Sequence, residues 1–229
     1  MSLIAKSVSS GGESDFVPVP VGMHLARCYR IVDLGTQPKQ TDFGIKHQRT
    51  IMVSFEVHGD SSDGQPLVTS RGEPMSISQD YNLTLNEKST LSKHLEGWRG
   101  TTFSEAERNG GFDIKKILGV WAMINVTAST SKKTAKVYHN ISGLLQVPRM
   151  IKEAGLPDGF NPLGYFSMED DVPDMEVFNS VSQYHQGKIK QSPEWQALFG
   201  EGTKALNGEG FHKPKASHPD SDMDDDIPF

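Results

Sequence analysis

The chain has 229 residues, 35% of them hydrophobic, a formal net charge of −6 and a single cysteine. This length suits one domain with appendages or two small domains, and one cysteine excludes an internal disulfide framework and a zinc site of several cysteines. No apolar run approaches the roughly 18 residues of a membrane span. Met1 to Gly12 also lacks the apolar core of a signal peptide. We therefore expect a protein of the reducing cytoplasm.

The negative charge is concentrated at the C-terminus. After Lys215 there is no Lys or Arg, and the five acidic residues are Asp220, Asp222, Asp224, Asp225 and Asp226. Removing these five from the 29 acidic residues leaves 24 against 23 basic residues in the first 215 positions. Phosphate binding depends on local charge and not on the total, so this near-neutral body can still carry a basic surface.

Residues 1–16 are rich in Ser and Gly, and we expect them to be disordered. Hydrophobic patterns then predict three strands, at about 23–34, 49–57 and 75–85. In the second strand the apolar side of the alternation should face the core, with the interleaved residues outside; the apolar residues are Ile51, Val53, Phe55 and Val57. The segments 35–46 and 58–74 read as exposed loops.

The pattern then changes to a helical one. Asn86 or Ser89 can cap a helix that runs to about Leu95 and stops at Gly97, and a short second piece covers 113–118. Two further strands follow, Val120 to Ala128 and Lys136 to Gln146. Three strands, a helical insertion and two strands are the order of an OB-fold, a five-stranded, partly open barrel. A β-sandwich is the alternative, although five strands are few for it.

Beyond Pro148 the chain becomes rich in Pro, Gly and acidic residues. A helix is predicted at about 175–188, where Val177, Val181 and Tyr184 form a partial apolar stripe. The run Ser192-Pro193-Glu194-Trp195 is typical of a cap and first turn, and that helix should stop at Gly200. We therefore predict a mainly β chain of four segments: a disordered N-terminus (1–16), an OB-fold domain (17–148), an extension with short helices (149–200), and a flexible linker with an acidic tip (201–229).

Binding of single-stranded nucleic acid needs cations along the backbone and flat aromatic faces for unpaired bases. Trp121 and Tyr138 alternate out of phase with the aliphatic residues of the last two strands, so they should form an outward stacking platform beside the lysines of the 129–135 turn. Trp121 could instead pack beneath the helical insertion or the C-terminal segment, and Phe43 could fold over a barrel end. Together with the basic loop 35–46, the candidate DNA-binding residues are Lys39, Phe43, Lys46, Arg49, Trp121, Lys132, Lys133, Lys136 and Tyr138.

Two further expectations concern the first strand. Arg27 and Arg30 should lie on opposite faces, so at most one of them faces a ligand. Cys28 should be a buried small hydrophobe and not a nucleophile.

No enzyme signature is present. The sequence contains no phosphate-binding loop, nucleophile elbow, zinc-protease or dinucleotide-binding motif. Its eight His residues are scattered and do not stand with acidic residues at metal-ligand spacing. We expect a non-enzyme with no catalytic residue, no metal and no cofactor.

The last residues have a composition suited to docking on another protein. Three adjacent carboxylates would be desolvated if the tip were buried in its own domain. Offered to a partner, Ile227 and Phe229 would fill a pocket while the carboxylates met a basic rim. The run Asp224-Asp225-Asp226-Ile227-Pro228-Phe229 closely resembles the C-terminal tip of bacterial single-stranded DNA-binding proteins. This resemblance implies recruitment of replication, recombination and repair enzymes.

The body is similar to OB-fold proteins from phage and prophage replication or recombination clusters. The segments that carry this resemblance are 26–27 with 32–37, 55–57, 81–89, 112–119 and 192–195. It implies a protein that coats single-stranded DNA without sequence specificity in a bacterial host cell. Small OB-fold proteins often assemble, so a homo-oligomer is an open alternative to a monomer. Two alternatives remain: an adaptor or decoy that uses the tip to occupy host repair enzymes, and a strand-annealing recombination protein.

Overall fold

One mostly antiparallel sheet organises the chain. The structure is a computed structural model that describes residues 17–41, 44–131 and 134–200. The strands are β1 (Gly22–Thr41), β2 (Gly44–His58), β3 (Ser76–Asn82), β4 (Trp121–Thr130), β5 (Val137–Leu145) and β6 (Gly164–Phe166). Their order is β3-β2-β1-β4-β5, with β6 parallel beside β1. Several predictions concern residues outside the described ranges: those for 1–16, for Phe43, for Lys132 and Lys133, and for the tip, Asp224 to Phe229.

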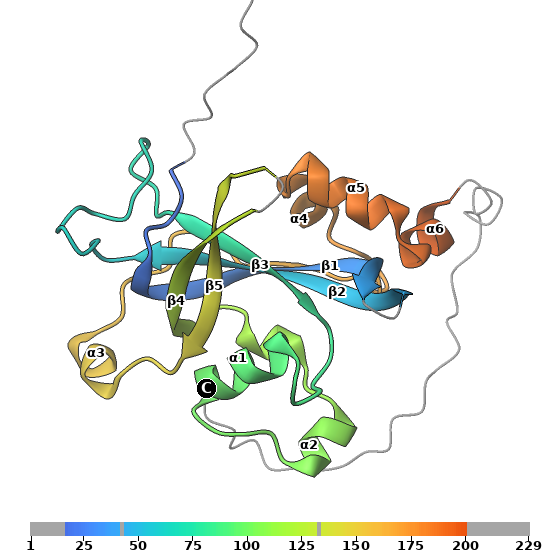
Figure 1. Cartoon of the computed structure of the whole chain (residues 1–229), viewed down its shortest axis with the longest axis horizontal. Helices are drawn as coiled ribbons and strands as arrows, with labels where there is room; N and C mark the ends of the chain where they lie inside the picture. The colour runs from blue at the N-terminus through green and yellow to red at the C-terminus, as the bar shows by residue number, and fades with distance from the viewer. Residues whose placement is uncertain (1–16, 42–43, 132–133, 201–229) are drawn as a thin grey trace, which may run out of the picture.

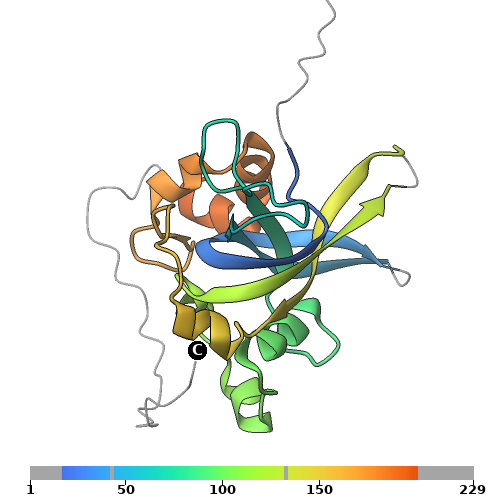
Figure 2. The ribbon, with the colours of Figure 1, turned by 90° about the vertical axis from the view of Figure 1, so that its left-hand side faces the viewer.

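The sheet is strongly curved, as Figures 1 and 2 show, but it is not closed into a barrel. Some residues of β3 and β5 approach within 8 Å between Cα atoms. Between the described residues of these two strands, however, there is no hydrogen-bonded ladder. The five predicted strands are present, whereas β6 was not predicted. The fold is mixed α/β, because helices cover much of the sheet.

The helices fall into two groups (Figure 1). Between β3 and β4 lie α1 (Thr90–Arg99), α2 (Glu105–Gly110) and the 3-10 helix η1 (Ile114–Ile117). After β5 come α3 (Arg149–Ala154), α4 (Met175–Ser180), α5 (Gln183–Gln191) and α6 (Pro193–Phe199). The first group packs on the inner side of the sheet, where the main core lies. Of the second group, α4, α5 and α6 contribute to a smaller core on the outer side of β1 and β2, whereas α3 lies apart from them and has no buried residue.

This second core corrects the prediction that only one face of β2 is buried. All residues from Ile51 to Val57 are buried. Met52 packs with Val32, Phe166 and Phe178 on the outer side, while Phe55 belongs to the main core. A strand covered on both faces loses the exposed side that alternation assumes.

The predicted loop 35–46 is instead the end of a long hairpin. β1 continues to Thr41 and pairs with β2 back to Gly44. Backbone hydrogen bonds join the two strands in this part of the hairpin, so the strands need no apolar side chains there. The polar composition was therefore misread as a loop.

A β-bulge changes the face that Arg30 occupies. Arg27 lies opposite Glu56, and Arg30 lies opposite Ser54, because the register shifts between Cys28 and Arg30. Glu56 and Ser54 are two residues apart on β2, so both arginines point to the same face. The prediction of opposite faces was wrong because simple alternation cannot show an extra residue.

Helix α1 begins as predicted and ends later than predicted. The side chain of Ser89 caps it by accepting the N–H of Ser92 at 3.1 Å. Gly97 lies inside the helix, where its carbonyl accepts the N–H of Gln146 at 3.0 Å. A Cβ on Gly97 would overlap the carbonyl oxygen of Leu144, so this glycine permits close packing of α1 on β5. The helix stops at Gly100, whose φ of 72° is left-handed.

The C-terminal helices follow the caps in the sequence. The predicted helix at 175–188 is divided into α4 and α5, because Ser182 caps a new helix by accepting the N–H of His185. Helix α6 is confirmed: Ser192 accepts the N–H of Trp195 at 3.2 Å, Pro193 occupies the first turn, and Gly200 ends it. Among the described helices, each is too short or too polar to cross a membrane.

Candidate nucleic-acid interface

Two hairpins carry three of the predicted lysines and the more exposed of the two predicted aromatic residues that the structure describes. Lys39 and Lys46 lie opposite each other near the end of the β1–β2 hairpin, and both are exposed. Tyr138 lies opposite Ser129 on the β4–β5 hairpin and is 50% exposed. Lys136, just before β5, is exposed as well. Figure 2 shows both hairpins projecting from the same side of the molecule.

The side chain of Tyr138 points to the outer face of its hairpin. Beside it, Asn140 lies opposite Thr127 and donates its side-chain N–H to Ser129 Oγ at 2.8 Å. A bulge on β5 near Ser142 changes the register closer to the core, but it leaves these outward positions together. The arrangement offers a tyrosine ring within a polar strip, and a base can stack there without displacing core contacts.

Trp121 does not join Tyr138 in one platform, as the sequence predicted. Ser129, which faces Tyr138, lies eight residues further along β4, so the two rings are roughly 26 Å apart along the strand at about 3.3 Å per residue. Trp121 is half-buried, and its ring meets the ring of His58 edge-on at 4.9 Å. Its carbonyl accepts the indole N–H of Trp98 at 2.8 Å. Trp121 and Tyr138 both lie on the outward-facing side of their strands, as predicted. The prediction that the two rings are neighbours was wrong.

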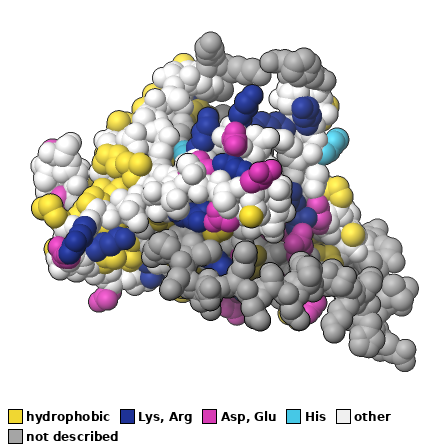
Figure 3. Space-filling model, turned by 90° about the horizontal axis from the view of Figure 1, so that it is seen from below, with side chains coloured by type: hydrophobic (Ala, Val, Ile, Leu, Met, Phe, Trp, Pro, Cys, Tyr) yellow, Lys and Arg dark blue, Asp and Glu magenta, His cyan; other side chains and the backbone are white. Residues whose placement is uncertain are grey.

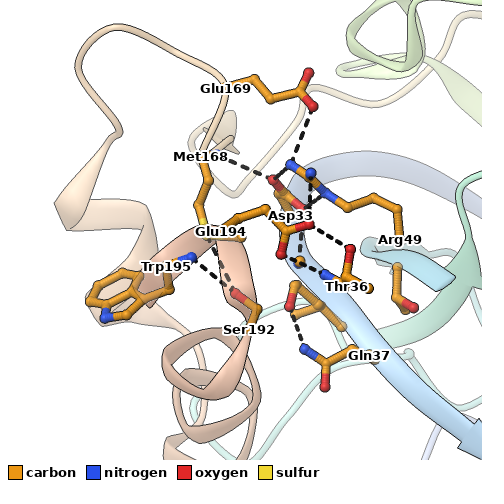
Figure 4. Close-up of polar contacts among 12 residues, drawn as sticks. Asp33, Thr36, Gln37, Arg49, Met168, Glu169, Ser192, Glu194 and Trp195 are labelled. Atoms are coloured by element: carbon orange, nitrogen blue, oxygen red, sulfur yellow. Dashed lines mark hydrogen bonds and ion pairs between the residues drawn. The ribbon is translucent and has the colours of Figure 1, made fainter. Parts of the chain in front are cut away.

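Arg49 is committed to an ion-pair network and not to a ligand (Figure 4). Its guanidinium donates to both carboxylate oxygens of Asp33, at 2.8 and 2.5 Å. Further contacts join it to Glu194 at 3.2 Å and to Glu169 at 3.4 Å. The hydrogen bond to Asp33 raises the pKa of Arg49, and the nearby carboxylates add to this effect. The sequence could not reveal these partners, which lie up to 145 positions away.

Glu194 completes this network by fixing the start of α6 to β1. It accepts the backbone N–H of Thr36 at 2.8 Å and the hydroxyl of Thr36 at 2.5 Å. Burial acts to raise the pKa of Glu194, but the Thr36 hydrogen bonds and the charge of Arg49 outweigh it, so the pKa lies below its ordinary value. Gly35 faces Ser192 so closely that a Cβ would overlap that side chain, and its φ of 73° is left-handed. This junction therefore requires glycine.

Helix α5 also contacts the outer side of the sheet. Lys188 donates to Asp80 of β3 at 2.8 Å, and His185 lies 3.5 Å from the other oxygen of the same carboxylate. The amide of Gln37 donates to the carbonyl of Lys188 at 3.0 Å. Helix α5 thus lies over the outer face of β1 to β3.

A cavity of about 370 Å³ lies on the inner side. Its walls are mainly aliphatic and aromatic, and they include Ile31, Ile51, Leu91 and Ile114. The charged groups at its edge pair with other protein groups; Arg108, for example, bonds Glu96 at 2.5 Å and Ser92 at 3.1 Å. The cavity therefore presents few polar groups to a ligand.

The described residues give no sign of metal or nucleophile chemistry. No group of three or more His, Cys, Asp or Glu side chains is placed to hold a metal within these ranges. Cys28 is buried in β1, as predicted, and burial raises the pKa of its thiol. A buried thiol with a raised pKa is a poor nucleophile.

Figure 3 shows that Lys and Arg side chains gather in the upper part of the face seen from below, with Asp and Glu side chains among them. No protein-family model matches the sequence, and no curated protein matches it.

Proposed function

We propose that the chain is a phage- or prophage-type single-stranded DNA-binding protein. It coats unpaired DNA without sequence preference and docks replication, recombination or repair enzymes through Asp224 to Phe229. We further propose that the curved sheet is an OB-type barrel left open between β3 and β5. The strand order, with a helical insertion between β3 and β4, supports this assignment.

The observation that carries the proposal is the pair of exposed hairpins. In OB-folds the loops joining strands 1–2 and 4–5 border the oligonucleotide site. Here the same two connections extend as hairpins with exposed Lys39, Lys46 and Lys136, and with Tyr138 on an outer face. Lysines neutralise phosphates and a tyrosine ring stacks on any base, so the combination suits binding that does not depend on sequence.

The C-terminal run of the sequence supports the second half of the proposal. Its three carboxylates, Ile227, Pro228 and Phe229 suit a basic, apolar pocket on a partner protein. The structure does not describe this segment.

The test is the affinity of the full chain for labelled oligo-dT, measured by fluorescence anisotropy, with Tyr138→Ala as the variant. Loss of one base stack should weaken binding by about 1–3 kcal/mol. Phe160→Ala is the matched control, because Phe160 is 56% exposed but lies in the segment that bonds Glu56, away from the hairpins. Equal affinity of the wild type and Tyr138→Ala would refute the assigned stacking residue. Absence of any oligo-dT binding would favour the adaptor alternative.

A further inference from the structure

Helix α5 presents an exposed aromatic ring beside β3. Tyr184 is 67% exposed, more than Tyr138 at 50%. Lys188 Nζ lies 4.9 Å from the centre of its ring, one helical turn further on, and the ring of His185 meets it edge-on at 5.2 Å. The sequence assigned Tyr184 to the apolar stripe with Val177 and Val181. The helix break at Ser182 changes the helical phase and turns the ring outward.

The carboxylate next to this ring is paired with a lysine, so it repels a phosphate chain less strongly. Asp80 of β3 would repel DNA, but it is paired with Lys188 at 2.8 Å and lies 3.5 Å from His185. Burial acts to raise the pKa of Asp80, yet the contacts with His185 and Lys188 outweigh it, so the pKa of this carboxyl lies below its ordinary value. Lys188 therefore contacts the Tyr184 ring and also pairs with the Asp80 carboxylate.

The position of β3 links this ring to the hairpin site. On one side Asp80 is bound by α5, and on the other side residues of β3 approach β5, the strand that carries Tyr138. The outward residues of β3 are small or polar, since Ser78 faces Ser54 and Asn82 faces Thr50. Strand β3 therefore lies between α5 and β5.

We propose that α5 forms the second side of the DNA track, with Tyr184 stacking on a base and Lys188 acting as a positioning residue. This inference rests on the proposed function and assigns a role to the C-terminal extension. The exposed tyrosines on β5 and α5 then hold bases on the two sides of β3.

The first test compares Tyr184→Ala and Tyr184→Phe for oligo-dT binding in the full chain. The alanine variant should weaken binding roughly 5- to 150-fold, the range for one lost base–aromatic stack, whereas phenylalanine keeps the ring and should bind like the wild type. Oligo-dT that binds the wild type and Tyr184→Ala equally would overturn this inference and leave the proposed function standing. A wild-type chain that does not bind oligo-dT would instead overturn the proposed function, and this inference with it.

The second test separates the role of Lys188 from general charge. Lys188→Ala should weaken binding, and adding Asp80→Asn should restore it, because the unpaired carboxylate is then gone. Lys190→Ala is the control: this lysine is exposed on the same helix but lies about 200° around it from Lys188. Failure of Asp80→Asn to restore binding, or an equal loss in Lys190→Ala, would overturn the role of Lys188 in neutralising Asp80.

Photocrosslinking gives a readout that does not depend on variants. Oligonucleotides with 5-iododeoxyuridine should crosslink to the wild-type chain at Tyr184 and at Tyr138, as located by peptide mass spectrometry. Crosslinks at Tyr138 with none in 183–191 would contradict the assignment of α5.

Discussion

At the scale of single residues, Glu56 shows how a buried charge connects the sheet to the C-terminal extension. Its side chain is fully buried, and one oxygen lies 2.8 Å from Arg27 Nε. It also accepts the backbone N–H groups of Phe160 at 3.0 Å and Asn161 at 2.7 Å. These bonds tie the segment after α3 to β2.

We predict that Glu56→Gln lowers the free energy of unfolding by about 3 kcal/mol, because it leaves the Arg27 guanidinium without its counter-charge in a buried place. Urea denaturation measures this loss. Glu153→Gln is the control, since its ion pair with Arg149 is exposed and should contribute less than about 1 kcal/mol. Equal effects of the two changes would contradict the structural role given to Glu56.

The same carboxylate predicts a dependence of stability on pH. Burial acts to raise the pKa of Glu56, but hydrogen bonds from Asn161, His58 and Phe160 outweigh it and lower the pKa from its ordinary 4.5. Because folding lowers this pKa, the contribution of Glu56 to stability is fully present above about pH 4.5. This contribution is lost as the pH falls through the pKa of Glu56 in the folded protein. Melting temperatures should therefore fall below about pH 4.5. The fall should be smaller in Glu56→Gln; an unchanged profile in that variant would contradict the assignment.

For Gly97→Ala we predict a loss of stability, although helix propensity alone would predict a gain. Alanine is the better helix former by about 1 kcal/mol. At this position, however, the added Cβ would overlap the Leu144 carbonyl oxygen, so we predict a net loss of about 1–3 kcal/mol. Gly110→Ala, where a Cβ meets nothing within 4 Å, should be neutral or stabilising. Thermal denaturation followed by circular dichroism compares the two variants, and a stable Gly97→Ala would refute the close helix–strand contact.

At the scale of elements, the sequence predicted what caps and alternation determine locally. Ser89, Ser192 and Pro193 placed helix starts correctly, and the five long strands were found. The full length of the β1–β2 hairpin was missed, because its ladder depends on backbone pairing with polar side chains. The bulges near Cys28 and Ser142 were also missed, because an extra residue has no signal in hydrophobic alternation.

The candidate site was predicted only in part for the same reason. Lys39, Lys46, Lys136 and Tyr138 are exposed on the two hairpins, as expected of ligand-binding residues. Arg49 looked equivalent to them in sequence, but its partners Glu169 and Glu194 come from the distant extension. The sequence predicted Tyr184 in the apolar stripe because the helical pattern was taken as continuous, whereas the helix is interrupted at Ser182. Long-range partners and changes of helical phase are properties of the folded chain.

The hairpin lysines give a prediction that belongs to this scale. Replacing Lys39 and Lys46 with Ala should weaken oligo-dT binding and make it less sensitive to salt, reducing the slope of log K against log salt by about 1.4, at roughly 0.7 per phosphate contact. Arg49→Ala should lower stability and leave that slope unchanged, because its charge is used within the protein. An unchanged slope in the double lysine variant would exclude these lysines from the phosphate contacts.

At the scale of the whole molecule, we propose separate roles for separate segments. In this proposal the curved sheet and α5 bind DNA, and the C-terminal tip recruits enzymes. The second core and the ion pairs of Arg49 and Lys188 hold the extension on the sheet.

Deletion of Asp224 to Phe229 tests this division. We predict loss of partner recruitment, measured by pull-down of purified replication and repair enzymes. Binding of oligo-dT should be intact or slightly tighter, since the deletion removes negative charge. Loss of DNA binding on this deletion would contradict the division of labour.

The central claim is tested most directly by titrating labelled oligo-dT with the full chain at low and then moderate salt. We expect saturable binding that weakens with salt, with a clear preference over duplex of the same length. A folded chain that gives a flat titration at low salt, or that binds duplex equally well, would contradict it.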